Sequence, residues 1–335
     1  MKGFSIIIVT WNGLRHLQTF LPSVVESDYE DFEVILAENA SDDDTIEWVK
    51  EYYPSVKIAL FDQNYGYTGG NNKAVPFAEK EILIFLNNDV KVDPYWLKGL
   101  NDVFEKYDDV VAAQPKILSY KEPTYFEYAG AAGGFLDSLG YPFCRGRVMD
   151  TVEKDDGQYD SEIDIAWASG AALAFKKEIF EEMGGFDEDY QFHMEEIDLC
   201  WRTLNAGHRI IYTPESKVFH LGGGSLPMGS SRKVFFNFRN SLFMLWKNLS
   251  FSQLWYKFPC RIFLDAIAAW RSLLSGKPGE FIAITKAHFY FLVSFSSIHK
   301  KRSKTLRTKD IPVLSPVLLI WKYFGRGKKK FSDLL

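Results

Sequence analysis

The stretch ILIFLNNDV, residues 82–90, indicates the fold class of the first part of the chain. Its apolar run has no polar alternation, which is typical of a strand buried on both faces, as in a parallel sheet covered by helices. The run ends abruptly in two amides and a carboxylate, Asn87, Asn88 and Asp89. This change indicates a rigid buried strand with polar side chains at its carboxyl end.

Similar apolar runs precede it at residues 4–10, 32–38 and 56–61. Residues 14–27 and 43–53 lie between these runs and have helical spacing, with Ser41 as the predicted N-cap of the second helix. Strands that alternate with helices predict an α/β fold, in which a mostly parallel sheet carries helices on both faces.

Polar residues follow several of these predicted strands. Thr10 and Asn12 follow the first, Glu38 ends the second, and Asn87 to Asp89 follow the fourth. Because ligands of such sheets bind beyond the carboxyl ends of the strands, we expect these side chains to meet at one rim.

The rest of the first 230 residues predicts shorter elements. Residues 110–165 are expected to hold short antiparallel strands, and the segment from 165 to 190 a strand, a helix and a turn. A helix follows and stops at Gly207, and RIIYT (209–213) and KVFH (217–220) read as two further strands.

The charge changes sign along the chain. Residues 231–335 hold 20 of the 39 Lys and Arg but only 4 of the 44 Asp and Glu, so residues 1–230 carry about −21 and the remainder about +16. We therefore predict two domains, a ligand-binding domain over residues 1–230 and a helical, basic region over residues 231–335. Nucleic acid is not an expected partner, because the acidic domain would repel it.

The basic region has helical stretches rich in Trp, Tyr and Phe, but no window with the 18 to 20 uncharged apolar residues of a spanning helix. Basic amphipathic helices of this kind favour the surface of an anionic membrane, to which KKRSKTLRTK (300–309) and RGKKK (326–330) would add attraction. The alternative is a helical cap on the sheet with a solvated basic tail.

Two features favour a reduced compartment. Cys144, Cys200 and Cys260 show no pairing pattern, and the first apolar run is too short for a signal peptide. We expect a cytoplasmic protein that associates peripherally with the inner face of the cell membrane.

Asn87 and Asp89 are two residues apart and point the same way if the strand stays extended. An amide and a carboxylate oxygen could then share a divalent cation, since Mg²⁺ takes one or two carboxylates together with phosphate oxygens. The alternative is a turn in which both side chains bond local backbone groups.

ENASDDDT (38–45) offers Glu38 as an acceptor for a nucleobase N–H or a ribose hydroxyl, while Ser41 and residues 42–44 cap the next helix. QNYGYTGGNNKAV (63–75) reads as a glycine-rich loop that runs into a helix and lets backbone N–H groups approach a phosphate. It matches neither a dinucleotide-binding fingerprint nor a Walker loop.

HMEEIDLCWR (193–202) places Glu195, Asp198 and Arg202 on one helix face, opposite an apolar stripe, with Asp198 and Arg202 paired at i, i+4. Glu196 has no evident partner, so it is a general-base candidate. The alternatives are a solvated acidic helix start and, for His220 at the end of KVFH, an ordinary strand-end histidine.

Taken in order, these motifs resemble the inverting family-2 glycosyltransferases of the GT-A fold, especially the rhamnosyltransferase-like branch. The resemblance spans about residues 3–245. It rests on IIIVTWN, ENASDDDT, NYGYTGGNN, FLNNDV, SGAALAFKKEIFEEMGGFDED, MEEIDLCWR, VFHLGGGS and RNS.

The resemblance implies a nucleotide-sugar donor, a Mg²⁺ or Mn²⁺ ion and a glycan acceptor, free or linked to a polyprenyl lipid. It assigns Thr10, Asn12 and Glu38 to the nucleoside and Asn72 to the donor. Asn87 and Asp89 stand at the family's metal motif, where Asn87 replaces the first acid.

The same resemblance assigns Glu196 as the base that activates an acceptor hydroxyl, and His220 to the neighbourhood of the metal and diphosphate. Two functions of other classes stay open from the residues alone. One is a sugar-1-phosphate nucleotidyltransferase, which would need a basic glycine-rich loop after the first strand. The other is a non-catalytic, membrane-bound protein that binds sugar nucleotides and needs no base.

Overall fold

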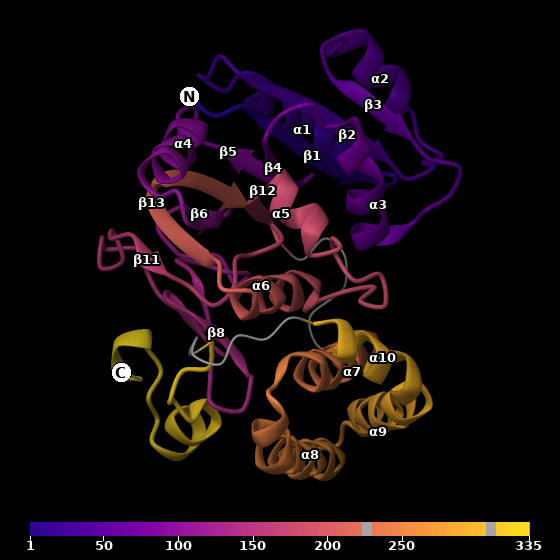
Figure 1. Ribbon diagram of the computed structural model, residues 1–335, viewed down its shortest axis with the longest axis vertical. Helices are drawn as coiled ribbons and strands as arrows, with labels where there is room; N and C mark the ends of the chain where they lie inside the picture. The colour runs from indigo at the N-terminus through magenta and orange to yellow at the C-terminus, as the bar shows by residue number, and fades with distance from the viewer. Residues whose placement is uncertain (223–229, 306–312, 335) are drawn as a thin grey trace.

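The computed structural model describes residues 1–222, 230–305 and 313–334, apart from the side chain of Ser303. Within them a mixed sheet carries helices on both faces, with the C-terminal helices at the far end of the molecule (Figure 1). The strand order is β11-β13-β6-β12-β4-β1-β2-β3, and β5 pairs with β13. The α/β fold predicted from the sequence is confirmed.

The predicted strands of the first part form as expected. They are β1 (Phe4–Thr10), β2 (Phe32–Glu38), β3 (Lys57–Leu60) and β4 (Ile82–Asn87). The remaining strands of this sheet are β5 (Val90–Val92), β6 (Val110–Ser119), β11 (Ile163–Asp164), β12 (Ala172–Lys176) and β13 (Arg209–His220).

The sheet is mostly parallel at its centre. β1 pairs in parallel with both β2 and β4, whereas β12 runs antiparallel between β4 and β6. The pleat divides the apolar side chains of β1 between two cores, because Ile6 and Ile8 face one side and Ile7 the other. This two-sided burial explains why the apolar runs show no alternation.

Helices cover both faces. The core on one face takes side chains from α1 (Leu14–Val25), α2 (Thr45–Tyr52) and α4 (Trp96–Lys106). The core on the other face takes them from α3 (Gly66–Ala74), α5 (Lys177–Glu182) and α6 (Glu195–Asn205), with η1 (Val75–Phe77) after α3.

Two details of the sequence prediction were wrong. Helix α2 begins at Thr45 after Asp44, and Ser41 bonds Glu38 and the Asn12 backbone N–H instead of capping it. The glycine-rich segment runs into a helix as predicted, and the helix begins at Gly66; a Cβ on Gly70 would lie 3.0 Å from Val9 and from Asn39, so glycine lets α3 pack closely on the strands. The two predicted strands after α6 form one strand, β13, with a bulge between Thr213 and Lys217.

The irregular segment holds a second, antiparallel sheet, as predicted. Its strands are β7 (Gly134–Leu136), β8 (Pro142–Cys144), β9 (Arg147–Val148) and β10 (Thr151–Val152). Phe331, near the C-terminus, packs its ring between Phe135 and Phe143 of this sheet at centroid distances of 5.2 and 5.9 Å. The last residues of the chain are therefore anchored on the first part.

The C-terminal region is helical, with α7 (Ser231–Asn248), α8 (Phe251–Leu274), α9 (Pro278–Val293) and α10 (Phe295–Lys304). One π-helical turn, η2 (Trp321–Gly325), and one 3₁₀ turn, η3 (Phe331–Asp333), follow. No single helix in the described ranges is long and apolar enough to cross a membrane; α9 and Phe295–Arg302 reach that length and composition only jointly, with a 65° bend between them.

Several basic residues of this region lie in the interior and not on the surface. Arg239, Lys247, Lys257, Arg261 and Arg302 are each 9% exposed or less. Burying a cation requires partners, and these residues find carboxylates or carbonyl oxygens. Part of the positive charge predicted to face a membrane thus lies inside, where Arg239, Lys247 and Lys257 bind residues of the first part of the chain.

Candidate functional site

The carboxyl ends of three neighbouring strands form the floor of the site. The register sets Thr10 opposite Glu38 and Val9 opposite Asn87, so Thr10, Glu38 and Asn87 lie side by side at one rim. Asn88 donates from Nδ2 to the Thr10 hydroxyl at 3.2 Å. A Cβ on Gly13 would lie 2.2 Å from that hydroxyl, which explains the glycine at this position.

Asp89 and His220 meet at this rim. His220 at the end of β13 donates from Nε2 to Asp89 Oδ1 at 3.1 Å, and Asn87 Nδ2 lies 3.4 Å from the same ring nitrogen. Asn88 and Asp89 form the turn between β4 and β5, so the strand does not stay extended through Asp89, although Asn87 and Asp89 both reach His220. That their amide and carboxylate oxygens share a cation stays a prediction.

Glu127 completes this cluster and was not predicted. Its Oε2 lies 3.3 Å from His220 Nδ1, on the side of the ring away from Asp89. Burial opposes the charge of His220, but the two carboxylates outweigh it and raise the pKa of the ring to about 10. Burial likewise opposes the ionised form of Asp89, yet the bond to His220 lowers the pKa of that carboxyl.

A divalent cation would find few protein ligands here. No group of three His, Cys, Asp or Glu in the described part of the chain is arranged to hold a metal ion. Asp89 and His220 supply one carboxylate and one imidazole that already face each other. This donor set fits an ion that takes its remaining ligands from phosphate oxygens and water, as Mg²⁺ commonly does.

Glu38 is the last residue of β2, and its side chain is fully buried. One carboxylate oxygen accepts from the Ser41 backbone N–H at 2.9 Å and from the Ser41 hydroxyl. The other oxygen, Oε2, is buried without a hydrogen-bond partner among the described residues. An orphaned acceptor of this kind suits a nucleobase or ribose donor, since an unsatisfied buried polar group is costly.

Asn12 lies against the loop that follows Glu38. It has a left-handed backbone with φ 51°, its side-chain oxygen accepts from the Asp42 N–H at 2.8 Å, and its own N–H donates to the Ser41 hydroxyl at 2.9 Å. These bonds tie the loop after β1 to the loop after β2.

Asn72 bonds other residues than these strand-end loops. Its amide oxygen accepts from the Phe186 N–H at 3.0 Å, and its amide nitrogen donates to the Phe186 carbonyl at 2.9 Å and to Glu188 at 3.2 Å. The side chain thereby joins α3 to the loop after α5. Its assignment as a donor contact stays a prediction.

Glu195 and Glu196 begin α6 with unusual electrostatics. Burial, followed by the charge of Glu196, raises the pKa of Glu195 well above its usual range. Burial also raises the pKa of Glu196, to about 7. Each has an Oε2 atom shielded from solvent with no hydrogen-bond partner among the described residues. Both shifts favour the protonated carboxyl, and a pKa of about 7 lets Glu196 exchange a proton near neutrality, as a general base must.

The start of α6 is close to the strand tips. The Asn87 N–H donates to the Ala171 carbonyl at 3.0 Å, and the neighbouring Gly170 carbonyl accepts from the Tyr67 hydroxyl at 2.8 Å. A Cβ on Gly170 would lie 2.9 Å from that hydroxyl and 3.8 Å from Glu196 Cβ. Backbone contacts thus connect the candidate base to the strand that carries Asn87.

Asp198 holds α6 in place. The predicted pair with Arg202 is confirmed at 2.9 Å, and Lys247 of α7 adds a second bond at 2.8 Å. Asp198 is fully buried, so the alternative of a solvated acidic helix start does not hold for it. Charges from α7, about 50 residues away, make that burial possible.

The loop before α6 is held from the C-terminal helices. His193 and Met194 both have left-handed backbones, with φ 64° and 73°, which is unfavourable for residues with side chains. Asn240 of α7 donates to the Phe192 and His193 carbonyls at 2.7 and 2.8 Å. Lys301 of α10 binds Asp187 and Asp189 of the same loop. Asn240, in the RNS motif, therefore supports the backbone that precedes and orients Glu195 and Glu196.

Part of the histidine motif lies outside the described residues. In VFHLGGGS, residues 223–225 are not described, whereas Leu221 donates from its N–H to the Asp89 carbonyl at 3.0 Å. A Cβ on Gly222 would lie 2.7 Å from Glu127 Oε1. The glycine after His220 thus gives Glu127 room beside the ring.

Curated proteins of known name are similar to this chain in sequence. N-acetylglucosaminyl-diphospho-decaprenol L-rhamnosyltransferase of Mycobacterium tuberculosis (strain ATCC 25618 / H37Rv) is 28% identical over 234 residues, covering 64% of this chain and 75% of the relative. Rhamnosyltransferase WbbL of Escherichia coli (strain K12) is 23% identical over 234 residues, covering 64% and 82%.

A solved structure agrees in fold. The mannosyltransferase PcManGT from Pyrobaculum calidifontis, in complex with GDP-Man and Mn²⁺, superposes with a TM-score of 0.53 at 17% identity, covering 91% of this chain and 83% of that one. The predicted GT-A fold is thereby confirmed. The sequence model of the family described as "Glycosyl transferase family 2" matches residues 5–184. The chain therefore belongs to glycosyl transferase family 2.

Proposed function

We propose that this glycosyltransferase moves a sugar from dTDP-rhamnose or a UDP-sugar to a lipid-linked glycan, with inversion, in the synthesis of a bacterial surface polysaccharide. Family membership decides against the nucleotidyltransferase and against the non-catalytic binding protein. The names of the Mycobacterium and Escherichia relatives support rhamnose, and the first of them supports an acceptor on a polyprenyl diphosphate.

The observation that carries the proposal is the position and pKa of Glu196. A general base works best when its pKa is close to the working pH, and burial raises the pKa of this carboxyl to about 7. Its orphaned Oε2 is free to accept a proton from an acceptor hydroxyl. The acceptor oxygen then bonds to the anomeric carbon while the bond from that carbon to the diphosphate oxygen breaks on the opposite face. One such displacement inverts the configuration.

The leaving diphosphate would be bound at the opposite side of the rim. Asp89 and His220 would hold a divalent cation, which neutralises the negative charge of the departing nucleoside diphosphate. The Mn²⁺ named with the Pyrobaculum mannosyltransferase supports this choice of ion. Asp89 and Glu127 favour a protonated His220 while no ion is bound, so ligating the cation would require the ring to release the proton that it donates to Asp89.

Glu38, Thr10 and Asn12 would bind the nucleoside. The unpartnered Oε2 of Glu38 accepts from a base or ribose, while Thr10 and Asn12 shape the wall of the pocket. We further propose that the protein works as a peripheral protein on the cytoplasmic face of the cell membrane, where it would meet a lipid-linked acceptor.

The test is a screen of nucleotide sugars with Mn²⁺, first for thermal stabilisation and then for transfer. A true donor at 100 times its Kd should add about 2.7 kcal/mol to the free energy of unfolding. Transfer to a polyprenyl-diphosphate glycan should give a product whose anomeric configuration, read by NMR coupling constants, is opposite to that of the donor. Retention of configuration, or stabilisation by every nucleotide sugar without any transfer, would refute the proposal.

A further inference from the structure

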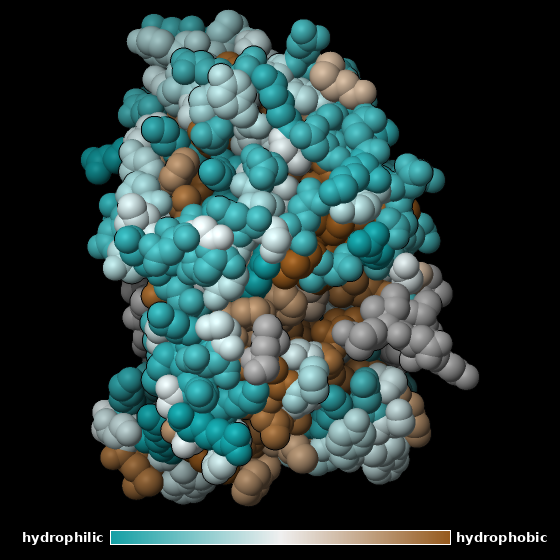
Figure 2. All heavy atoms as spheres, turned by 90° about the vertical axis from the view of Figure 1, so that its left-hand side faces the viewer, coloured by the Kyte–Doolittle hydropathy of each residue, from teal (hydrophilic) through white to brown (hydrophobic). Residues whose placement is uncertain are grey.

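Apolar side chains collect on the surface of the C-terminal region. Of the 23 large apolar side chains that the described residues expose, 16 lie between Phe251 and Phe324. Figure 2 shows apolar residues reaching the surface at the lower end of the molecule, where Figure 1 places α8 and the C-terminal segment. Surface exposure on this scale marks an interaction site more often than chance scatter.

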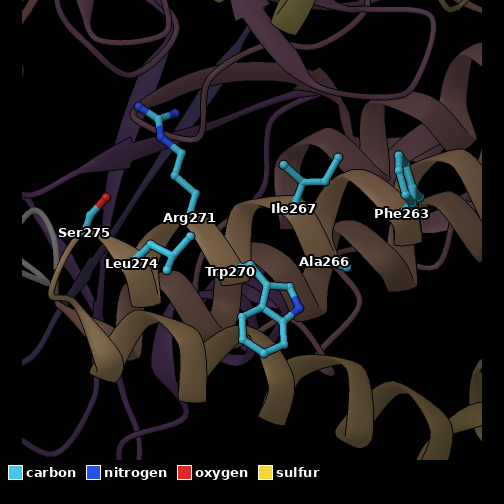
Figure 3. A pocket seen from close by; sticks show the side chains of 7 residues that line it. All are labelled: Phe263, Ala266, Ile267, Trp270, Arg271, Leu274 and Ser275. Carbon is cyan, nitrogen blue, oxygen red and sulfur yellow. The ribbon is translucent and has the colours of Figure 1, made fainter.

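Helix α8 exposes a continuous apolar stripe. Its exposed members recur at helical spacing along all 24 residues: Phe251, Trp255, Phe263, Ile267, Trp270 and Leu274. At 1.5 Å per residue this stripe is about 35 Å long. Figure 3 shows Phe263, Ile267 and Arg271 projecting to one side of the helix. These three residues and their neighbours on α8 line a hollow of about 560 Å³.

The apolar surface continues onto η2. Trp321 and Phe324 are 58% and 50% exposed and, together with Leu264 of α8, line a second hollow of about 450 Å³. The guanidinium of Arg271 lies 5.3 Å from the centre of the Phe324 ring and so links the stripe of α8 to η2. We call the exposed stripe of α8 together with η2 the α8 face.

Positive charge borders the α8 face and negative charge is scarce. Arg271, Arg326 and the lysines 328–330 are exposed. Asp265, the acidic residue of α8, is fully buried between Arg261 at 2.8 Å and His288 at 3.2 Å. The helix has thus turned its carboxylate inward and its tryptophans outward, which is the reverse of a solvated helix.

We infer that the α8 face docks on an anionic lipid bilayer, with α8 lying along the headgroup boundary. Tryptophan, tyrosine and phenylalanine prefer this depth, and adjacent Lys and Arg bind anionic headgroups. A helix that is apolar on its outer side and packed on α9 on its inner side is suited to lie on a membrane and not to cross it. The inference deepens the proposed function, because it names the surface that brings the enzyme to a lipid-borne acceptor.

A second copy of the chain is the competing occupant of this face. A contact between two α8 faces would offer the positive border of each copy no exposed acid on the α8 of the other. Anionic headgroups complement both the apolar stripe and the positive border. The observations therefore favour lipid over self-association.

The first experiment is co-sedimentation of the full chain with vesicles of phosphatidylcholine and phosphatidylglycerol in equal parts, without donor. The triple variant Trp255→Glu, Phe263→Glu and Trp270→Glu should bind at least about tenfold more weakly than the wild type. Tyr52→Glu is the matched control, since Tyr52 is 60% exposed on α2, and it should bind like the wild type. Equal binding by the triple variant overturns the inference. So does a wild type that ignores vesicles and forms a dimer which the triple variant dissolves.

A milder variant guards against misfolding. Vesicles with brominated acyl chains should quench wild-type tryptophan fluorescence, and Trp270→Phe should keep the binding while reducing the quenching. Unchanged quenching in a Trp255→Phe, Trp270→Phe and Trp321→Phe variant would contradict docking through this face. Neither assay contains a nucleotide sugar, so failure here leaves the transfer reaction untested, and failure of transfer leaves these results intact.

Discussion

Glu196→Gln should make the enzyme both slower and more stable. In the folded chain burial raises the pKa of Glu196 to about 7, against an ordinary 4.5. At about 1.4 kcal/mol per pH unit, ionising this buried carboxyl lowers the free energy of unfolding by up to roughly 3 kcal/mol. The loss begins as the pH rises above the ordinary pKa and is complete above the folded-state pKa. Glutamine has the same shape and no charge, so it removes that loss.

The expected activity moves in the opposite direction. A general base contributes about 10²- to 10⁴-fold, and the variant should lose transfer by that factor while keeping its donor affinity. The wild-type rate should rise with pH and level off above about 7, because only the ionised Glu196 accepts the proton. This pH dependence should be absent from the residual activity of the variant.

The assays are urea unfolding of both proteins at pH 5 and pH 8, and initial rates of transfer over the same range. The stability difference should be small at pH 5 and favour the variant at pH 8. Glu195→Gln is the matched control, since burial and the charge of Glu196 raise the pKa of Glu195 and disfavour the ionised form that a base needs; its loss should leave most of the transfer activity. If Glu195→Gln abolishes transfer and Glu196→Gln does not, the two roles are reversed.

Three further outcomes are expected. Asp89→Asn should abolish Mn²⁺-dependent donor binding in calorimetry, because it removes the carboxylate that faces His220; unchanged affinity would count against the metal site. Glu38→Ala should weaken nucleoside diphosphate and intact donor equally, whereas an effect on the donor alone would mean that Glu38 reads the sugar. Lys247→Met should lower the free energy of unfolding by about 3–5 kcal/mol in urea, because the buried Asp198 and the partly buried Asp187 each lose one of their two cations, while the exposed Lys286→Met should stay within about 0.5 kcal/mol.

The sequence was sufficient for the parts of the site that depend on local pattern. Apolar runs without alternation predicted the central strands, and the rule for strand ends predicted that Thr10, Glu38 and Asn87 would meet. The spacing of Asp198 and Arg202 predicted their pair, since both lie on one helix. Each of these inferences needs only residues that are close in sequence or in equivalent places on parallel strands.

The sequence alone did not predict the contacts between distant segments. Glu127 lies in a segment without periodicity, and nothing there signals that it will flank His220. Lys247 read as one more basic residue of an amphipathic region, yet it pairs with Asp187, which is 60 residues earlier. Ser41 was predicted to cap a helix because serine commonly does so, but its hydroxyl bonds the buried Glu38 carboxylate instead.

The ion pairs between α6 and the C-terminal helices limit how this enzyme can be recombined. The family match ends at residue 184, before the loop that carries Asp187 and the helix that carries Glu196. A chimaera joined there, with the C-terminal half of a relative, would take the loop, the helix of the candidate base and α7 all from that relative. A junction placed after α6 would instead set Asp187 and Asp198 opposite the side chains of a foreign α7. The loop before α6, α6 and α7 should therefore be exchanged together, as one block.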